Sequence, residues 1–193
     1  MPFWIKYLLE TGALAAIAGG AWKAWMQWER VRYQRKMAKQ LKGDNHIEQA
    51  LQSIVNDTPA HYAQVIRIHN GGKEISAGLP LYMTVLHEHT AWGCFPLKES
   101  IQKMPVDKSY RNKIAELVER KDVHVAVDDP DFKDNTLQSI WRHMEAKYAR
   151  SIIISIGQKG IYFLRTTSRT DPIDNPYDLQ FRQCISRLKP FYP

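Results

Sequence analysis

The stretch that decides the fold is IRIHNGGKEISAGLPLYMTVLHEH, from Ile66 to His89. It begins and ends with segments of strand length, and the glycines between them predict a chain reversal, so we expect an antiparallel pair of strands. Alternation along the first strand puts Ile66 on one face and His69 on the other. A histidine and an asparagine stand directly before Gly71, where generic turn residues would serve, so the turn needs an explanation.

Two interpretations of His69 and Asn70 remain open. Gly71 can adopt a positive φ, and Asn70 can close an Asx-type turn, so the pair can pin the following loop by hydrogen bonds to its backbone. Alternatively, both side chains line the mouth of a pocket beneath residues 73–78. The structural interpretation is favoured because an Asn-Gly turn needs no ligand.

The rest of the chain predicts an α+β domain. Asn45 and Glu48 resemble a capping box, and the helix that follows is stopped by Asp57-Thr58-Pro59. Gly157-Gln158-Lys159-Gly160 predicts a hairpin. The expected strands are 62–69, 81–89, 123–127, 151–156 and 161–166, and the further helices are 110–120, 136–149 and 177–188. Antiparallel strands with flanking helices are typical of the α+β class.

The N-terminus predicts one transmembrane helix, within residues 1–28. The segment YLLETGALAAIAGGAWKAWMQW, Tyr7 to Trp28, reaches about 33 Å as a helix. Glu10 and Lys23 weaken this interpretation, and a signal peptide, a buried soluble helix and an interfacial helix are the alternatives. The expected membrane-interface residues are Trp4, Tyr7, Trp22, Trp25, Trp28, Arg30, Arg32, Arg35 and Lys36.

The positive charge of the chain is concentrated beside this segment. Residues 29–42 hold six Lys/Arg and one Glu, a net charge of +5 out of the chain's +7. Residues 29–44 therefore read as a basic juxtamembrane helix or linker that contacts membrane lipid. The positive-inside rule then predicts an inner (cytoplasmic) membrane protein with its C-terminal domain in the cytoplasm. The remaining domain, residues 45–193, is nearly neutral, so we expect no nucleic-acid partner.

Small residues recur every four positions within the N-terminal segment. Gly12, Ala16 and Gly20 would allow two helix backbones to approach closely, which favours a homo-oligomer. The alternative is that alanine and glycine are simply common in membrane helices.

The order of elements over roughly residues 45–189 resembles the GAF domain, a sensing and dimerisation fold related to PAS. The stretch around the turn is similar to a bacterial and phage subgroup of GAF-like proteins with a His-Asn-Gly strand end and an N-terminal membrane helix. The matching positions here are His69, Asn70, Gly71, Leu79, Pro80 and Glu88. The resemblance implies the fold and adds Gly71 and Glu88 to His69 and Asn70 as candidate ligand-binding residues, but it implies no particular ligand.

Signatures of catalysis and metal binding are missing from the sequence. It has no P-loop, dinucleotide fingerprint or nucleophile elbow, so we predict neither an enzyme nor a cofactor. His87 and His89 share a strand face near Cys94, but this set lacks the convergent ligands of a zinc site. Cys94 and Cys184 are expected to be free thiols. The run Asp128-Asp129-Pro130-Asp131 reads as a loop.

Two functions from different classes remain. The first is a membrane-anchored, cytoplasm-facing GAF-like module for ligand sensing or protein interaction, without enzymatic activity. The alternative is a phage structural, lysis or entry protein that uses the GAF-like fold as a scaffold, with a membrane-inserting N-terminal helix.

Overall fold

The structure is a computed structural model that describes residues 2–10, 13–71, 75, 79–128 and 135–192. The chain forms two compact units, Met1–Asp44 and Asn45–Pro193. The first unit contains helix α1 (Phe3–Glu10) and most of helix α2 (Ala13–Asp57), and the unit boundary falls inside α2.

Helix α2 corrects the expectation of a separate helix that starts at Asn45. The helix continues through Gly43 and Asn45 without a break and ends at Asp57, where the stop signal was predicted. A glycine in an exposed helix costs only about 1 kcal/mol relative to alanine. Ile47, Leu51 and Ile54 are buried in the core, and their packing stabilises the helix against that cost.

The described helices of the N-terminal segment do not meet the requirements of a membrane span. None of the helices in the described part of the chain combines the length and the apolar character that crossing a membrane needs. The span expected within residues 1–28 therefore lacks support. The physical reason is visible in the sequence, because only twelve uncharged residues separate Glu10 from Lys23, and the polar Gln27 follows.

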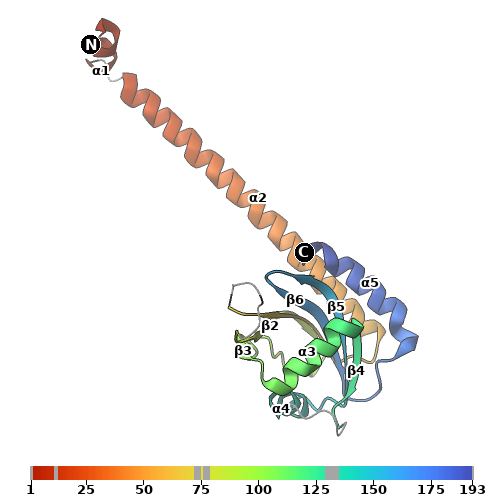
Figure 1. The fold of residues 1–193 in the computed structure, drawn as a ribbon. Coiled ribbons are helices and arrows are strands. Elements are labelled where there is room, and N and C mark those ends of the chain that lie inside the picture. The colour runs from red at the N-terminus through yellow and green to blue at the C-terminus, as the bar shows by residue number, and fades with distance from the viewer. Residues whose placement is uncertain (1, 11–12, 72–74, 76–78, 129–134, 193) are drawn as a thin grey trace. The chain divides into compact units, whose positions relative to one another are not determined.

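The second unit is built on one antiparallel sheet (Figure 1). Its strand order is β3-β2-β1-β6-β5-β4. The strands are β1 (Tyr62–His69), β2 (Tyr82–Thr90), β3 (Met104–Pro105), β4 (Asp122–Ala126), β5 (Tyr148–Gly157) and β6 (Gly160–Ser168). The predicted pairing of β1 with β2 and the β5–β6 hairpin are both confirmed. Gly160 is required in this hairpin, since an added Cβ would lie 2.7 Å from the carbonyl oxygen of Ile68.

Helices cover both faces of the sheet, and the α+β class is confirmed (Figure 1). The remaining helices are α3 (Lys108–Arg120), α4 (Asn135–His143) and α5 (Asp178–Leu188), with short 3-10 turns η1 (Asn175–Tyr177) and η2 (Lys189–Phe191). The helix predicted to continue to Ala149 ends at His143 instead. Tyr148 and Ala149 pair with β6, because backbone pairing in the sheet outweighs their helical spacing. The two-residue strand β3 was not predicted.

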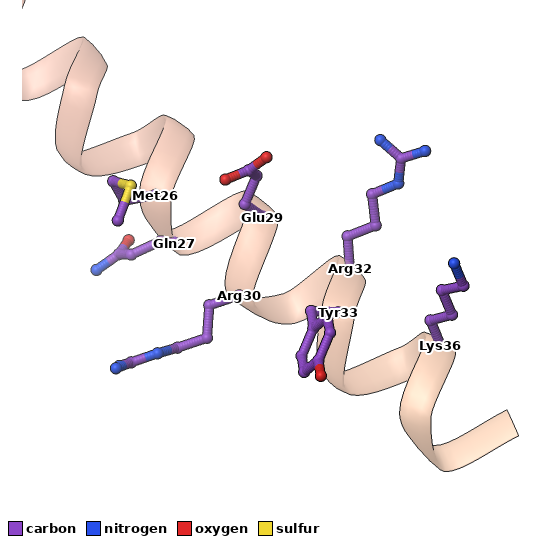
Figure 2. A pocket seen from close by; sticks show the side chains of 7 residues that line it. All are labelled: Met26, Gln27, Glu29, Arg30, Arg32, Tyr33 and Lys36. Atoms are coloured by element: carbon purple, nitrogen blue, oxygen red, sulfur yellow. The ribbon is translucent and has the colours of Figure 1, made fainter. Parts of the chain in front are cut away.

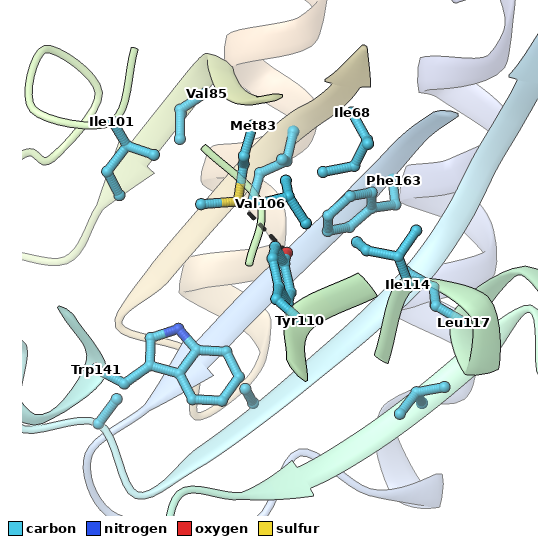
Figure 3. Packing of buried hydrophobic residues seen from close by; sticks show 14 of the residues in the cluster. Ile68, Met83, Val85, Ile101, Val106, Tyr110, Ile114, Leu117, Trp141 and Phe163 are labelled. Atoms are coloured by element: carbon cyan, nitrogen blue, oxygen red, sulfur yellow. Dashed lines mark hydrogen bonds between the residues drawn. The ribbon is translucent and has the colours of Figure 1, made fainter. Parts of the chain in front are cut away.

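Two hydrophobic cores result from the alternation along the strands. Ile66 and Ile68 point toward α3 and α4, where Figure 3 shows Tyr110, Trp141 and Phe163 among the packed side chains. Val65 points to the other face and packs with residues of α2 and α5. The faces of β1 are therefore those that the sequence predicted. Cys94 and Cys184 are free thiols, as expected.

Candidate functional site

His69 is the last residue of β1 and is buried within the predicted turn. Its Nδ1 accepts a hydrogen bond from the backbone N–H of Gly71 at 3.1 Å. Nε2 therefore bears the proton, and it donates to Oγ1 of Thr84 at 2.9 Å. The same oxygen accepts from the backbone N–H of Lys103 at 3.1 Å. Neutral His69 thus joins the end of β1 to β2 and to the segment before β3.

The electrostatic surroundings of His69 agree with this neutral form. Burial lowers its pKa from the ordinary value of 6.5, and the positive charges of Arg67 and Lys103 lower it further. The unfolded chain therefore binds a proton more readily than the folded chain does. Below about pH 6.5, acidification destabilises the fold through this residue.

The turn itself depends on the glycine at position 71. Gly71 has a φ of 81°, which confirms the predicted left-handed backbone. Asn70 is buried beside it. Of the following loop, residues 72–74 and 76–78 lie outside the described part of the chain.

Gly71→Val is expected to lower the free energy of unfolding by about 1 to 2 kcal/mol, because a β-branched residue is strained at positive φ. No atom of the described residues lies within 4 Å of a Cβ added there, so the expected cost comes from the backbone. Urea denaturation of the full chain measures it. Gly71→Asn is the matched control and should cost less, since asparagine tolerates this conformation. Equal stabilities of the two variants would contradict the assignment.

A pocket of about 480 Å³ opens beside the turn and is lined by Arg67, His69, Gly71, Tyr82 and Lys103. Arg67 donates from Nη2 to the carbonyl oxygen of Lys159 at 2.7 Å, while its Nε is buried and has no hydrogen-bond partner among the described residues. Two of the predicted ligand-binding residues, His69 and Gly71, thus line a pocket that attracts anions.

Glu88, the fourth predicted ligand-binding residue, lies away from this pocket. Gln64 pairs with Glu88 and His69 pairs with Tyr82, so the two sites lie about 17 Å apart along β1. The Glu88 carboxylate accepts from Nε2 of Gln64 at 2.6 Å and from the backbone N–H groups of Leu97 and Lys98 at 2.7 and 2.8 Å. These bonds hold the turn after β2.

The histidines of β2 contact other side chains of the domain. His89 pairs with Glu48 of α2 at 2.6 Å, and the ring of His87 lies against Tyr192. No group of three or more histidine, cysteine, aspartate or glutamate residues is placed to hold a metal ion within the described ranges. Of the acidic run at 128–131, only Asp128 is described.

A second site, which sequence reasoning missed, surrounds Arg165 of β6. Its side chain is buried on the sheet face that α3 and α4 cover. Nη2 donates to the hydroxyl of Tyr110, whose own bond to the sulfur of Met83 is drawn in Figure 3. Nε donates to Oγ of Ser151 at 3.4 Å. The rings of Tyr110, Trp141 and Phe163 lie 5.2 to 5.4 Å from the guanidinium carbon.

Among the described residues, Arg165 has no ion-pair partner. Within the described residues, no carboxylate oxygen lies within 4.0 Å of its nitrogens. The adjacent cavity holds only about 20 Å³, room for about one water molecule. The signal was present in the sequence, because Arg165 shares a strand face with Ile161 and Phe163. A charged residue on an otherwise apolar face marks either a buried ion pair or a binding site.

The predicted membrane-interface residues lie in the N-terminal unit. Trp4, Tyr7, Trp22, Trp25 and Trp28 are exposed, and Arg32 lies 5.3 Å from the ring of Trp28. Figure 2 shows Arg30 extending from one side of α2, and Arg32 and Lys36 extending from the opposite side. Arg35 is exposed on the same helix. Ala16 and Gly20 are also exposed, whereas Gly12 lies outside the described residues.

Solved structures with GAF domains share this fold. A GAF domain/HD domain protein from Geobacter sulfurreducens matches with a TM-score of 0.54 and 10% identity, over 77% of this chain and 91% of that one. The phycocyanobilin-bound GAF domain of a cyanobacterial phytochrome matches with a TM-score of 0.51 and 14% identity, over 83% and 89%. The chromophore-binding domain of a bacteriophytochrome from R. palustris matches with a TM-score of 0.50 and 12% identity, over 76% of this chain and 54% of that one.

These similarities establish a GAF-like fold for the second unit. The chain spans about half the length of the bacteriophytochrome domain that it matches. No protein-family model matches the sequence, and no curated protein matches it significantly.

Proposed function

We propose that the protein is a non-enzymatic, ligand-sensing module, and that its ligand presents an anionic group to Arg165. The observation that supports this proposal is the burial of the Arg165 guanidinium in the core beneath α3 and α4 without a carboxylate partner. An arginine stays charged at any physiological pH. Burial of an unpaired charge costs several kcal/mol, which an anionic ligand would recover.

The surroundings of Arg165 favour a planar or tetrahedral oxyanion. The guanidinium presents several N–H donors in a fixed fork that matches a carboxylate or a phosphate. Hydrogen bonds to the neutral oxygens of Tyr110 and Ser151 hold this fork without neutralising it. Lys113 of α3 also lines this cavity, although its ammonium pairs with Glu116 at 3.2 Å.

The size of the cavity implies two states of the module. The present space of about 20 Å³ excludes any metabolite. Entry of a ligand therefore requires that side chains of α3 or α4, such as Tyr110 and Trp141, move away from Arg165. A module that opens on binding can report the ligand to a partner, since the ligand shifts the population of the two arrangements.

The comparisons support small-molecule binding by this type of fold. One matching GAF domain contains phycocyanobilin, and another match is a chromophore-binding domain. Both ligand-bearing proteins share at most 14% of residues with this chain. Their chromophores therefore give no guide to the identity of the ligand here.

A melting-temperature screen of the full chain tests the proposal. The panel contains small mono- and dicarboxylates, amino acids and phosphate esters. A ligand at 100 times its Kd stabilises the folded state by about 2.7 kcal/mol, which raises the melting temperature. Arg165→Met should abolish the increase, and the exposed Arg187→Met should retain it. If a compound stabilises wild type and Arg165→Met equally, Arg165 does not bind that compound.

We further propose that the N-terminal unit tethers the module to the cytoplasmic side of the inner membrane. The exposed tryptophans of α2 supply apolar surface with a polar edge, and the basic residues from Arg30 to Lys36 supply positive charge. Anionic headgroups complement both features. This tether requires binding to lipid and does not require a complete span.

Vesicle sedimentation of the full chain tests the tether. Arg32→Gln combined with Arg35→Gln should weaken binding to vesicles that contain phosphatidylglycerol roughly ten- to thirtyfold, at about 1 kcal/mol for each charge. The matched control replaces two exposed basic residues of the second unit, Arg120 and Arg187, by glutamine. Equal losses in the two double variants would mean that net charge, and not this segment, directs the protein to lipid.

A further inference from the structure

A second polar groove lies on the opposite face of the sheet from Arg165. It has a volume of about 330 Å³ and lies between α5 and the strands β4 and β5. Six of its lining residues are polar or charged: Asp122, Arg150, Asp178, Arg182, Ser186 and Lys189. The groove belongs to neither the turn at His69 nor the cavity at Arg165.

Arg150 of β5 forms the buried wall of this groove. Its side chain is 4% exposed, and its guanidinium stacks on the ring of Phe181 with a carbon-to-centroid distance of 4.5 Å. Nε and Nη2 donate to the two carboxylate oxygens of Asp122 at 3.1 and 2.6 Å, and Nη2 also donates to Asp178 at 2.7 Å. Nη1 is buried and has no partner within the described part of the chain. A buried donor without an acceptor is costly.

The helix side of the groove adds three more donors. Arg182 and Ser186 are four residues apart on α5 and therefore share a face, and Lys189 follows directly after the helix. All three are exposed. Their side chains can reach a ligand without first breaking an ion pair, since none of them takes part in a salt bridge among the described residues.

The charge balance of the groove favours an anion. The carboxylate oxygens of Asp122 and Asp178 already accept hydrogen bonds from Arg150. The hydrogen bond from Arg150 lowers the pKa of Asp178. Three cations against two carboxylates leave the lining at +1, and the uncommitted groups are mainly donors.

We propose that this groove binds a small molecule through a phosphate group, which accepts hydrogen bonds from Arg182, Ser186 and Lys189 beside the buried guanidinium of Arg150. Phosphate suits this site better than carboxylate, because it presents three acceptor oxygens and a charge of about −1.5 to −2 to donors on both sides of the groove. The volume of 330 Å³ leaves room for the organic part of the molecule against Ile152 and Ile185. This site is independent of the anion site proposed at Arg165.

Calorimetry of the full chain with inorganic phosphate and with glucose 6-phosphate tests the site in solution. Arg182→Gln and Lys189→Gln should each weaken binding about tenfold, since each removes one charge-assisted hydrogen bond. Both residues are exposed, so the variants should fold. Arg187→Gln is the matched control, because it removes the same charge from the same helix outside the groove, and it should bind like wild type.

A second arm identifies the source of the phosphate. Phosphatidylcholine vesicles with and without phosphatidic acid are compared for the same three variants, so that binding by the N-terminal unit is common to all. If binding to vesicles alone is lost in Arg182→Gln and Lys189→Gln but kept in Arg187→Gln, the groove binds a lipid headgroup. If binding of inorganic phosphate or glucose 6-phosphate is lost in the same two variants, the groove binds a free metabolite. Variants that match the control in both arms overturn the proposal.

Discussion

Arg150→Met is expected to lower the free energy of unfolding by about 2 to 4 kcal/mol, somewhat less than the roughly 3 to 5 kcal/mol for removing one partner of a fully buried ion pair. Methionine fills similar space but leaves two carboxylates, Asp122 and Asp178, facing each other without their shared cation. These carboxylates are 35% and 38% exposed, so water recovers part of the loss. Equilibrium urea denaturation near pH 7 measures the change.

The same variant should also change the dependence of stability on pH. The pKa of Asp178 is lowered by the hydrogen bond from Arg150. A carboxyl with a lowered pKa in the folded state stabilises the fold above its ordinary value of 3.8, and this stability is lost as the pH falls through the lowered value. The difference between wild type and Arg150→Met should therefore shrink below about pH 4.

Arg187→Met is the control for this prediction, since it removes an exposed charge from α5. It should change the free energy of unfolding by less than about 0.5 kcal/mol. If Arg150→Met is as mild as this control, the three-residue network does not stabilise the sheet edge.

Arg165→Met is expected to have the opposite effect on stability. Without ligand, it should leave the free energy of unfolding unchanged or raise it by up to about 2 kcal/mol, because an apolar residue replaces an unpaired buried charge. Tyr110 keeps its bond to the sulfur of Met83 after the exchange. The same substitution should remove ligand binding completely.

The two arginines form a matched pair for this comparison. Each is 4% exposed, and each stacks on an aromatic ring. Arg150 has two carboxylate partners, whereas Arg165 has only neutral oxygens and sulfur within reach among the described residues. A loss of about 2 kcal/mol or more in Arg165→Met would show that its neutral contacts already stabilise the charge, and the argument for a ligand would fail.

Local signals predicted much of the second unit. The bounds of β1, the hairpin between Gly157 and Gly160 and the stop of α2 at Asp57 all follow from short-range rules of alternation and turn chemistry. Such features depend on residues adjacent in the sequence, which a single chain shows directly. The positive φ of Gly71 also follows from the local sequence of the turn.

The candidate sites depended on residues far apart in the sequence. Arg165 could be placed on an apolar strand face, but the sequence did not show whether a carboxylate would meet it there. Arg150 illustrates the same limit, since each of its partners, Asp122 and Asp178, is 28 residues away. Glu88 was grouped with His69 by resemblance, yet the antiparallel register places it at the other end of the strand pair.

The continuity of α2 shows that tertiary packing can override a local helix-start signal. Asn45 and Glu48, spaced as in a capping box, predicted a helix start. The apolar residues from Ile47 onward pack against α5 and the sheet, and this packing keeps the helix intact through the weak positions.

Native mass spectrometry of the full chain, purified gently from expressing cells, tests the proposed anion site at Arg165 most directly. We predict a fraction of wild-type protein with an additional small mass that denaturation releases as an acidic compound, and its absence from Arg165→Met. The compound, once identified, should raise the melting temperature of wild type alone. The account is contradicted if wild type has no added mass and no compound of the panel stabilises it, or if Arg165→Met retains the same compound.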